Sequence, residues 1–512
     1  MTVAELLGAL LQPALLQALP AVSDAVGSTT ATAVVYDSRR ATPGAVFVGL
    51  RGQKDDGARF APQAVARGAV LVVAETPAPD AYQGAWVVVP DARLALAVLA
   101  DRFHQHPSGA LRVVGITGTN GKTTTAYLLR SILEAAGERC GLLGTVVYSV
   151  GREDREATRT TPESPDVQHM LHEMVDNGCA AAVMEVSSHA LALKRVDGVQ
   201  FAAGVFSNLT RDHLDFHGDM ETYFASKRRL FEMLPDGAPA VVNVDDPKGQ
   251  LLAASVRRPV TYGMHTSADV TPEPFDYALT GLRFTARTPR GDLRVKSTLV
   301  GQPNVYNLLA AIATADALAV PHEAIESGIE QLPGVPGRFE VVSQPGDDIG
   351  VVVDYAHTDD ALKNLLETAR ALSTGRLITV FGCGGDRDRT KRPLMGAVGG
   401  KLSDVLIVTS DNPRTEDPAA IIDEVLRGIP GGADRAARGS RPGPRGPEVL
   451  AIVDRRDAMT KAIDIARPGD LVIVAGKGHE KTQVVGDREL PFDDVAVSRE
   501  ALARRRMRQR VG

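Results

Sequence analysis

Residues 115–125 read GITGTNGKTTT, a glycine-rich stretch between an apolar run and a helical pattern. The run LRVVGIT (111–117) is rich in β-branched residues, and residues 123–137 have helical spacing of their apolar side chains. Backbone N–H groups at a helix start, with Lys122 as a cation and Thr123 as a hydroxyl, suit a nucleotide triphosphate and Mg²⁺. The order strand, glycine loop, helix therefore predicts a phosphate-binding loop rather than an incidental turn.

The glycine spacing of this loop is unusual. The common phosphate-binding loop has a glycine five residues before Gly-Lys-Thr, where this chain has Ile116. The glycines lie instead at Gly115, Gly118 and Gly121. This shortened spacing separates the chain from common GTPases and motor ATPases.

Short apolar runs alternate with Ala/Leu-rich helical stretches along most of the chain. Such alternation predicts an α/β fold with parallel sheets covered on both faces, whose ligands collect at the carboxyl ends of strands. The runs are AVLVVAE (69–75), AWVVVP (85–90), LRVVGIT (111–117), AAAVMEV (180–186), APAVVNV (238–244), GVVVDYA (350–356), RLITVFG (376–382), DVLIVTS (404–410) and DLVIVAG (470–476).

The chain has 512 residues, which is too long for one core at roughly 100–200 residues per domain. Two Pro/Gly-bearing breaks, HQHPSGA (104–110) and LPGVPGRFE (332–340), divide it. The predicted domains are residues 1–110, 111–336 and 337–512.

Composition is that of an ordinary globular protein, with 44% hydrophobic and 23% charged residues. A formal charge of −6 offers no broad basic surface, so nucleic acid is not expected as a partner. Cys140, Cys179 and Cys383 are far apart, which excludes a disulfide framework or a CxxC zinc site and favours a reducing compartment.

The apolar N-terminal segment, residues 1–22, could be mistaken for a targeting or membrane segment. However, the first Lys or Arg of the chain is Arg39, so the segment lacks the charged start of a signal peptide, and Glu5, Gln12 and Gln17 interrupt the apolar run. We therefore expect a short amphipathic helix on the first domain, a cytoplasmic protein without membrane insertion, and a monomer.

A carboxylate ends one of the apolar runs in the central segment. In AAAVMEVSSHAL the run ends at Glu185 and is followed by Ser187, Ser188 and His189. A glutamate at the tip of a strand near the phosphate loop is placed to act as a direct or indirect Mg²⁺ ligand. A solvated strand-end glutamate is the alternative, but the polar cluster favours function.

Residues 208–231, NLTRDHLDFHGDMETYFASKRRLF, contain a second polar cluster and a lysine at a position where the helical pattern predicts an apolar residue. The crowding of His213 and His217 with two aspartates would suit zinc, but no cysteine joins them and magnesium chemistry is already implied. Lys227 falls on the apolar stripe of the following helix. Because a bare ammonium is costly to bury, either its amine reaches out to solvent or Lys227 is modified or paired.

Four strand ends in the last segment carry polar or charged residues. They are DYAHTDDALKN (354–364), FGCGGDRDRTKRP (381–393), TSDNPRTEDP (409–418) and VAGKGHEKTQ (474–483). One Asp–Arg pair is usually a surface ion pair, but four such strand ends in one domain indicate a ligand site.

These motifs resemble those of the Mur ligase family, the ATP-dependent amide-bond-forming enzymes of peptidoglycan precursor synthesis. The resemblance covers essentially the whole chain and rests on GTNGKTT, MEVSSHAL, NLTRDHLDFHG, DYAHT, FGCGGDRD, DNPR and AGKGHE. It implies an N-terminal UDP-sugar-binding α/β domain, a central P-loop ATPase domain and a C-terminal Rossmann-like domain for the incoming amino acid. The nearest branch of the family adds the third residue of the stem peptide.

The resemblance also implies roles for individual residues. Those expected around ATP are Gly118, Thr119, Asn120, Gly121, Lys122, Thr123, Thr124, Asn304, Arg338, Asp354 and His357. Those expected around the UDP-N-acetylmuramoyl-dipeptide are Ser38, Gln53, Lys54, Asp55, Thr160, Thr161, Ser187 and Arg195. The expected Mg²⁺ ligands are Thr123, Glu185, His213 and Lys227 as carbamylated N6-carboxylysine, and the catalytic residues are Lys122, Lys227, His213 and Arg338.

In this family the sequence DNPR accompanies diaminopimelate, and relatives that add lysine lack its arginine. Arg414 would then clamp the distal carboxylate that lysine lacks. The expected pocket is Arg387, Asp411, Asn412, Pro413, Arg414, Gly476 and Glu480, with Glu480 facing the distal ammonium. The meso isomer is the default, while LL-diaminopimelate or L-lysine remains the alternative.

The sequence disfavours two rival functions. Another ligase such as folylpolyglutamate synthase is disfavoured by the N-terminal segment, which resembles a UDP-sugar domain. A non-catalytic nucleotide sensor would need neither Lys227 nor the DNPR pocket.

Overall fold

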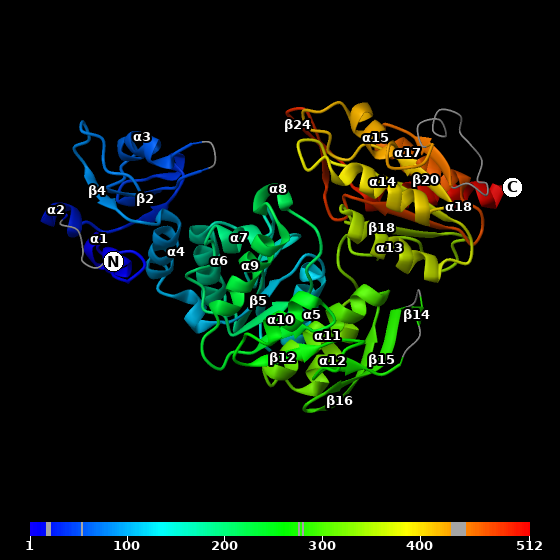
Figure 1. Ribbon diagram of the computed structural model, residues 1–512, viewed down its shortest axis with the longest axis horizontal. Coiled ribbons are helices and arrows are strands. Elements are labelled where there is room, and N and C mark those ends of the chain that lie inside the picture. The colour runs from blue at the N-terminus through cyan, green and yellow to red at the C-terminus, as the bar shows by residue number, and fades with distance from the viewer. Residues whose placement is uncertain (17–21, 53–54, 275–276, 279–280, 432–446, 512) are drawn as a thin grey trace.

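The computed structural model describes residues 1–16, 22–52, 55–274, 277–278, 281–431 and 447–511. Three α/β bodies follow one another along the chain, with the first (blue) and the last (yellow to red) on either side of the central one (Figure 1). The predicted α/β class is confirmed, and each main sheet is confined to one of the three predicted segments. The boundary positions themselves stay a prediction.

The first body is built on a parallel sheet of order β1-β2-β3-β4. Its strands are β1 (Ala33–Val35), β2 (Ala45–Gly49), β3 (Leu71–Ala74) and β4 (Ala85–Val88). Its helices are α1 (Val3–Leu7), α2 (Asp24–Gly27), α3 (Ala61–Ala66) and α4 (Ala92–Phe103), with 3₁₀ turns η1 (Gly8–Leu10), η2 (Ser38–Arg40), η3 (Gly57–Phe60) and η4 (Pro107–Ala110). The side chains of Val3, Leu6 and Leu7 enter its core, so the apolar N-terminal segment packs on this body as expected.

The central body has an eight-stranded sheet of order β12-β11-β10-β5-β9-β6-β7-β8. Its strands are β5 (Arg112–Thr117), β6 (Cys140–Leu143), β7 (Val147–Ser149), β8 (Asp154–Glu156), β9 (Ala181–Glu185), β10 (Ala203–Phe206), β11 (Ala240–Asn243) and β12 (Pro259–Tyr262). Its helices are α5 (Lys122–Ala135), α6 (Ser164–Asp176), α7 (Ser188–Ala192), α8 (Leu214–His217), α9 (Met220–Glu232), α10 (Pro247–Ala253), α11 (Gln302–Ala317) and α12 (His322–Gln331). Strand β5 lies between β9 and β10, so the glycine loop that follows it opens at the middle of the sheet edge.

Both faces of this central sheet are covered, as its apolar strands require. One core contains α5, α11 and α12, and the other contains α6 and α9. A small antiparallel sheet is formed by β13 (Thr271–Pro272), β14 (Tyr277–Ala278), β15 (Gly281–Thr288) and β16 (Gly291–Ser297), and β15 and β16 pack on the first core. The apolar-run pattern did not predict this sheet, because its strands alternate buried and exposed residues.

The last body has a six-stranded sheet of order β17-β18-β22-β19-β20-β21, parallel except for β17. Its strands are β17 (Glu340–Val341), β18 (Gly350–Asp354), β19 (Leu377–Phe381), β20 (Val405–Val408), β21 (Glu448–Ala451) and β22 (Leu471–Ala475), and a hairpin is formed by β23 (Thr482–Val485) and β24 (Arg488–Pro491). Helices α13 (Asp359–Leu372), α14 (Lys391–Leu402) and α15 (Pro418–Leu426) cover one face, and α17 (Arg455–Ile465) and α18 (Asp494–Val511) the other. The nine predicted strands are all present in the three bodies.

Candidate active site

The glycine loop joins β5 to α5 and folds around its own lysine. Lys122 is the first residue of α5, and its Nζ donates to the carbonyl oxygens of Gly118 (2.9 Å) and Thr119 (2.8 Å). Gly118 has φ +148°, and a Cβ there would lie 1.9 Å from the Ser207 hydroxyl. Only glycine fits this position, so the spacing noted in the sequence follows from close packing of the loop on the segment after β10.

The carboxylate of Glu185 lies beside this loop, as predicted. Its side chain is 1% exposed and accepts hydrogen bonds from the Thr123 hydroxyl (3.1 Å), the Thr145 hydroxyl (3.0 Å) and the Thr145 amide (2.8 Å). The Thr160 hydroxyl lies 3.1 Å from that of Thr145. A buried carboxylate and a hydroxyl are thus adjacent at the start of α5.

Lys227 projects from α9 into the same site. It is 1% exposed, which excludes an amine that reaches solvent. Its Nζ donates to the carbonyl oxygen of Gly118 (2.8 Å), the same atom that accepts from Lys122, and lies 4.4 Å from the ring centre of Tyr223. Burial lowers the pKa of Lys227 well below its usual value, and the charge of Lys122 lowers it further. Two lysine amines therefore meet at one carbonyl oxygen.

His213 lies at the edge of this cluster, where α8 begins. Its backbone has φ +54°, a left-handed conformation rare for residues with a side chain, which indicates local strain. Its Nε2 is 3.3 Å from the Asp212 carboxylate, and its ring centre is 4.8 Å from that of His189. Within the described residues, no group of three or more His, Cys, Asp or Glu side chains is arranged to hold a metal ion.

The last body reaches across to the glycine loop. Arg338 donates from Nη2 to the Thr123 hydroxyl (3.2 Å), and its guanidinium stacks 4.5 Å from the ring centre of Tyr355. Asn120 donates from Nδ2 to the Asp360 carboxylate at 3.0 Å. These contacts hold the first residues of the last body against the loop.

Asp354 and His357 lie at the end of β18, where both carboxylate oxygens of Asp354 and Nδ1 of His357 already have hydrogen-bond partners. The Asp354 carboxylate accepts from the amides of Phe339 and Ala356, both at 2.7 Å, while burial raises its pKa. His357 donates from Nδ1 to the Tyr355 carbonyl at 2.9 Å. In this conformation Asp354 shapes the loop that carries Arg338.

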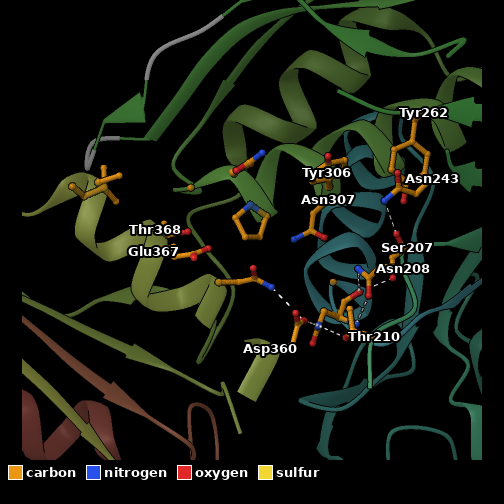
Figure 2. Close-up of a pocket in the computed structure, with 18 residues that line it drawn as sticks. Ser207, Asn208, Thr210, Asn243, Tyr262, Tyr306, Asn307, Asp360, Glu367 and Thr368 are labelled. Carbon is orange, nitrogen blue, oxygen red and sulfur yellow. Dashed lines mark hydrogen bonds between the residues drawn. The ribbon is translucent and has the colours of Figure 1, made fainter. Parts of the chain in front are cut away.

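Two adjoining cavities open at this edge of the central sheet. One, of about 300 Å³, is lined by Thr119, Asn120, Gly121, Lys122, Thr123, Thr124, Glu185, His213, Asn304, Arg338, Asp354 and His357, among others. The other, of about 420 Å³, shares Asn120, Gly121 and Asn307 with it and extends to Asn243, Tyr262 and Tyr306 (Figure 2). The first cavity therefore unites nearly all the residues expected around ATP.

Sequence reasoning missed the larger cavity. Its walls come from the end of β11, from α11 and from Asp360, Glu367 and Thr368 on α13 (Figure 2). The available signals were Asn243, at the carboxyl end of a predicted strand, and the shared loop residues Asn120 and Gly121. The rest depends on α11 and α13 lining the same space.

The residues expected around the UDP-linked substrate lie in two bodies. In the central body, the Thr161 hydroxyl donates to the Glu185 carbonyl (2.7 Å) and accepts from the Ser187 amide (3.1 Å). The Thr161 carbonyl accepts from Arg195 (3.1 Å). Together with Thr160 they form one cluster next to the Glu185 carboxylate.

The other expected substrate residues belong to the first body. Ser38 donates its hydroxyl proton to Gln63 at 2.6 Å, and Asp55 lies in an exposed ion pair. Gln53 and Lys54 lie outside the described residues.

A cavity of about 520 Å³ spans the first and central bodies. Tyr36 and Arg40 line it from the first body, and Arg159, Glu163 and Asp166 from the central one. Arg40 pairs with Asp166 at 2.8 Å across this boundary.

The expected amino-acid pocket lies at the carboxyl ends of three neighbouring strands. Arg387 follows β19, residues 411–414 follow β20, and Gly476 and Glu480 follow β22. Because β19 lies between β20 and β22, these loops meet at one sheet edge. The structure thus brings together the predicted set Arg387, Asp411, Asn412, Pro413, Arg414, Gly476 and Glu480.

Among the described residues, two arginines in this pocket bond to backbone carbonyls and to no side chain. Arg414 donates to the carbonyls of Gly385 (2.8 Å) and Asn412 (3.5 Å), and Arg387 donates to that of Asp386 (3.0 Å). Burial and the charge of Arg387 lower the pKa of Arg414. Arg414 also has φ +53°, so a strained backbone presents this side chain. Within the described residues neither guanidinium has a carboxylate partner, so both cations are available to pair with an anionic ligand.

The acidic side of the pocket is tightly packed. A Cβ at Gly476 would lie 2.6 Å from the Asp411 carboxylate, so glycine is required there. Asn412 donates from Nδ2 to Glu480 at 2.9 Å. The pocket therefore offers a cationic wall and an anionic wall.

Of the helices in the described ranges, none is long and apolar enough to cross a bilayer.

Comparisons with known proteins agree with this architecture. Residues 30–104 match the family model "Mur ligase family, catalytic domain", residues 116–315 "Mur ligase middle domain", and residues 337–478 "Mur ligase, glutamate ligase domain". The chain is 47% identical over 482 residues to a protein of Solibacter usitatus named UDP-N-acetylmuramoyl-L-alanyl-D-glutamate–2,6-diaminopimelate ligase, covering 93% of this chain and 94% of the relative. It is 48% identical over 467 residues to a protein of the same name from Geobacter metallireducens, covering 90% and 91%.

Solved structures show the same fold. A structure of a UDP-N-acetylmuramoyl-L-alanyl-D-glutamate–2,6-diaminopimelate ligase superposes with a TM-score of 0.67 at 34% identity, covering 95% of this chain and 98% of that one. MurF from Acinetobacter baumannii superposes with a TM-score of 0.65 at 20% identity, covering 99% and 98%. The chain therefore belongs to the Mur ligase family of ATP-dependent amide-bond-forming ligases and has its three-domain fold.

Proposed function

We propose that this ligase joins diaminopimelate to the D-glutamyl γ-carboxylate of UDP-N-acetylmuramoyl-L-alanyl-D-glutamate, forming ADP and phosphate. The observation that carries the substrate assignment is the pair Arg387 and Arg414, whose guanidiniums bond only to backbone carbonyls. A distal carboxylate would satisfy them, and lysine has none. The names of the relatives from Solibacter usitatus and Geobacter metallireducens support the same substrates.

ATP fits the two adjoining cavities as its binding site. The amine of Lys122 now bonds to two loop carbonyls, and a bound phosphate would offer it an anionic partner instead. The triphosphate would lie along residues 118–124 and toward Arg338, while the cavity lined by Tyr262 and Tyr306 would take the nucleoside. Asn304, Asp354 and His357 complete the walls.

The residues present also fit Mg²⁺. Thr123 and Glu185 place a hydroxyl and a buried carboxylate oxygen 3.1 Å apart, and oxygen ligands with room for water and phosphate are what Mg²⁺ prefers. His213 and Lys227 in carbamylated form would complete the set. When bound, the ion supplies positive charge that stabilises the transferring phosphoryl group.

The surroundings of Lys227 support its carbamylation, which the family resemblance implies. Burial lowers the pKa of its amine and so favours the neutral form that can attack CO₂; the product, after loss of a proton, is a carbamate anion. An anion next to Lys122 replaces repulsion by attraction. The modification would therefore resolve the meeting of two lysine amines at the Gly118 carbonyl.

The proposed reaction has two steps. The γ-carboxylate of the substrate attacks the terminal phosphorus of ATP, ADP leaves, and an acyl phosphate forms; Lys122 and Arg338 stabilise the developing negative charge. The neutral amine of diaminopimelate then attacks the acyl carbon, and the tetrahedral intermediate expels phosphate as the nitrogen loses a proton. Thr160, Thr161, Ser187 and Arg195 are placed to orient the substrate beside Glu185.

We propose the domain limits 1–110, 111–336 and 337–512, with Ser38, Gln53, Lys54 and Asp55 of the first domain holding the uridine nucleotide. The proposed site residues come from one chain, which favours a working monomer. The requirement for ATP favours the cytoplasm. Among the isomers of diaminopimelate we propose meso, with LL-diaminopimelate and L-lysine as the alternatives that the first assay separates.

Phosphate release from ATP tests this function. The enzyme is mixed with UDP-N-acetylmuramoyl-L-alanyl-D-glutamate and, in turn, meso-diaminopimelate, LL-diaminopimelate and L-lysine, with Lys122→Met as the inactive control. Release that requires the UDP-substrate and a diaminopimelate isomer is expected. Release with lysine alone would refute the role of Arg414, and no release with any amino acid would refute the ligase.

A further inference from the structure

Lys477 is a fully buried lysine within the proposed amino-acid pocket. It follows β22 in the sequence AGKGHE and is 0% exposed. Its Nζ donates to Oδ1 of Asn412 and to Oε2 of Glu480, both at 3.0 Å. Both partners belong to the predicted pocket, whereas Lys477 itself was not predicted.

The hydrogen bonds fix the orientation of the Asn412 amide. Its Oδ1 accepts from Lys477 and from the Val484 amide (3.0 Å), while its Nδ2 donates to Oε2 of Glu480 (2.9 Å). Flipping the amide would place Nδ2 against the two donors and Oδ1 against the Glu480 carboxylate, and all three bonds would be lost. Lys477 thus holds one side of a closed triangle of polar groups.

The same triangle leaves one carboxylate oxygen of Glu480 available. Lys477 and Asn412 both bond to Oε2, and within the described chain no hydrogen bond is recorded for Oε1. The Glu480 side chain is 32% exposed, in contrast to the buried Lys477. Glu480 therefore has one anchored oxygen and one oxygen free to accept a ligand.

We propose that Lys477 is a positioning residue for amino-acid selection, which holds Glu480 so that its free oxygen accepts the distal ammonium of the incoming diamino acid. This rests on the proposed function of the pocket. Without the Lys477 amine, Glu480 keeps a single anchor, the Asn412 amide loses one of two donors to Oδ1, and the carboxylate can rotate away from its ligand.

The backbone at Lys477 has an independent anchor. Arg455 donates from Nη2 to the carbonyl of Ala475 at 3.0 Å and pairs with Asp494 on α18. The end of β22 is therefore held without the Lys477 side chain. This makes Lys477→Met, which keeps much of the buried stem but removes the charge, a usable variant.

The test compares two ligands in the full-length enzyme. Diaminopimelate carries the distal amine, and 2-aminopimelate keeps both carboxylates and the reacting amine but lacks it. For Lys477→Met we expect kcat/KM for diaminopimelate to fall on the order of 10- to 100-fold, because the charged hydrogen bond between Glu480 and the distal ammonium is weakened. For 2-aminopimelate, measured as substrate or as competitor, we expect a change within about 3-fold, and the KM for ATP should be unaffected.

A second variant and a double replacement sharpen the test. Lys477→Gln keeps a donor without the charge and should lie between wild type and Lys477→Met. In a Glu480→Gln background, Lys477→Met should lose most of its effect, because its partner is already altered. Equal losses for both ligands, an unchanged kcat/KM for diaminopimelate, or failure of both single variants to fold would each overturn the assignment. If the proposed function itself is wrong, the wild-type enzyme will be inactive with diaminopimelate. That result distinguishes failure of the proposed function from failure of the role of Lys477.

Discussion

Lys227 in the central domain and Arg455 in the C-terminal domain are each 1% exposed, but their partners differ. Arg455 forms two hydrogen bonds with the Asp494 carboxylate, at 2.8 and 2.7 Å. Lys227 donates to a carbonyl oxygen that it shares with another lysine. A buried cation with a carboxylate partner is compatible with a stable fold. A buried cation that faces a like charge lowers the stability of the fold, and such groups cluster at functional sites.

A second pair repeats the contrast within the C-terminal domain. Arg392 is 0% exposed and bonds to the carboxylates of Glu416 and Glu424 at 2.8–2.9 Å. Arg414, at the edge of the same sheet, bonds to carbonyls alone. The difference indicates that Arg414 is available to bind an anionic ligand, while Arg392 has a structural role.

The largest expected effect is that of Lys227→Ala. If the carbamylated lysine supplies an anion at the site, turnover should fall on the order of 10³-fold, and acetate or formate should restore part of it. Phosphate release measures turnover, and a melting curve checks that the variant is folded; turnover above a tenth of wild type would contradict the proposal.

Asp494→Asn should act on stability instead. It leaves the Arg455 charge buried without a full partner, which typically costs ~3–5 kcal/mol. Urea-induced unfolding should show this loss, while activity per folded molecule stays near wild type. The double replacement Arg455→Met with Asp494→Leu is the control, since it removes both charges and should recover much of the stability.

Arg414→Leu should lower kcat/KM for diaminopimelate about 100-fold with little change in the KM for ATP, because only the distal carboxylate loses its partner. Arg389→Leu is the matched control, since Arg389 forms an exposed pair with Glu424 nearby. Steady-state kinetics of both variants measure kcat/KM for diaminopimelate and the KM for ATP. Equal effects of the two replacements would remove the distinction between paired and unpaired arginines.

The smallest effect concerns pH and His217, which is 7% exposed and lies 2.9 Å from the Ser188 hydroxyl. Burial is the main cause that lowers the pKa of His217 to about 4 from its ordinary 6.5. Between these values the unfolded chain binds more protons, so stability should fall as the pH drops from about 6.5 toward 4. Melting temperatures across this range should decline less steeply in His217→Gln than in wild type; identical slopes would contradict this.

Much of the fold was predictable because the apolar runs are local signals. Nine strands and the glycine loop follow from residues adjacent in sequence, and the inward face of Lys227 follows from helical periodicity. The strands of the small antiparallel sheet were missed, because alternating strands give a weaker local signal than continuous apolar ones.

The sequence by itself determined the family, the phosphate loop and the chemical types at the strand ends. Tertiary structure alone decided which of these groups have partners. The cavity beside Tyr306 exists because α11 and α13 both line it, and the bonds from Lys477 exist because the loops after β20 and β22 come together above the end of β19. The physical reason is that hydrogen bonds and charge pairing depend on distances of a few ångströms between residues far apart in the chain, which periodicity along the chain does not encode.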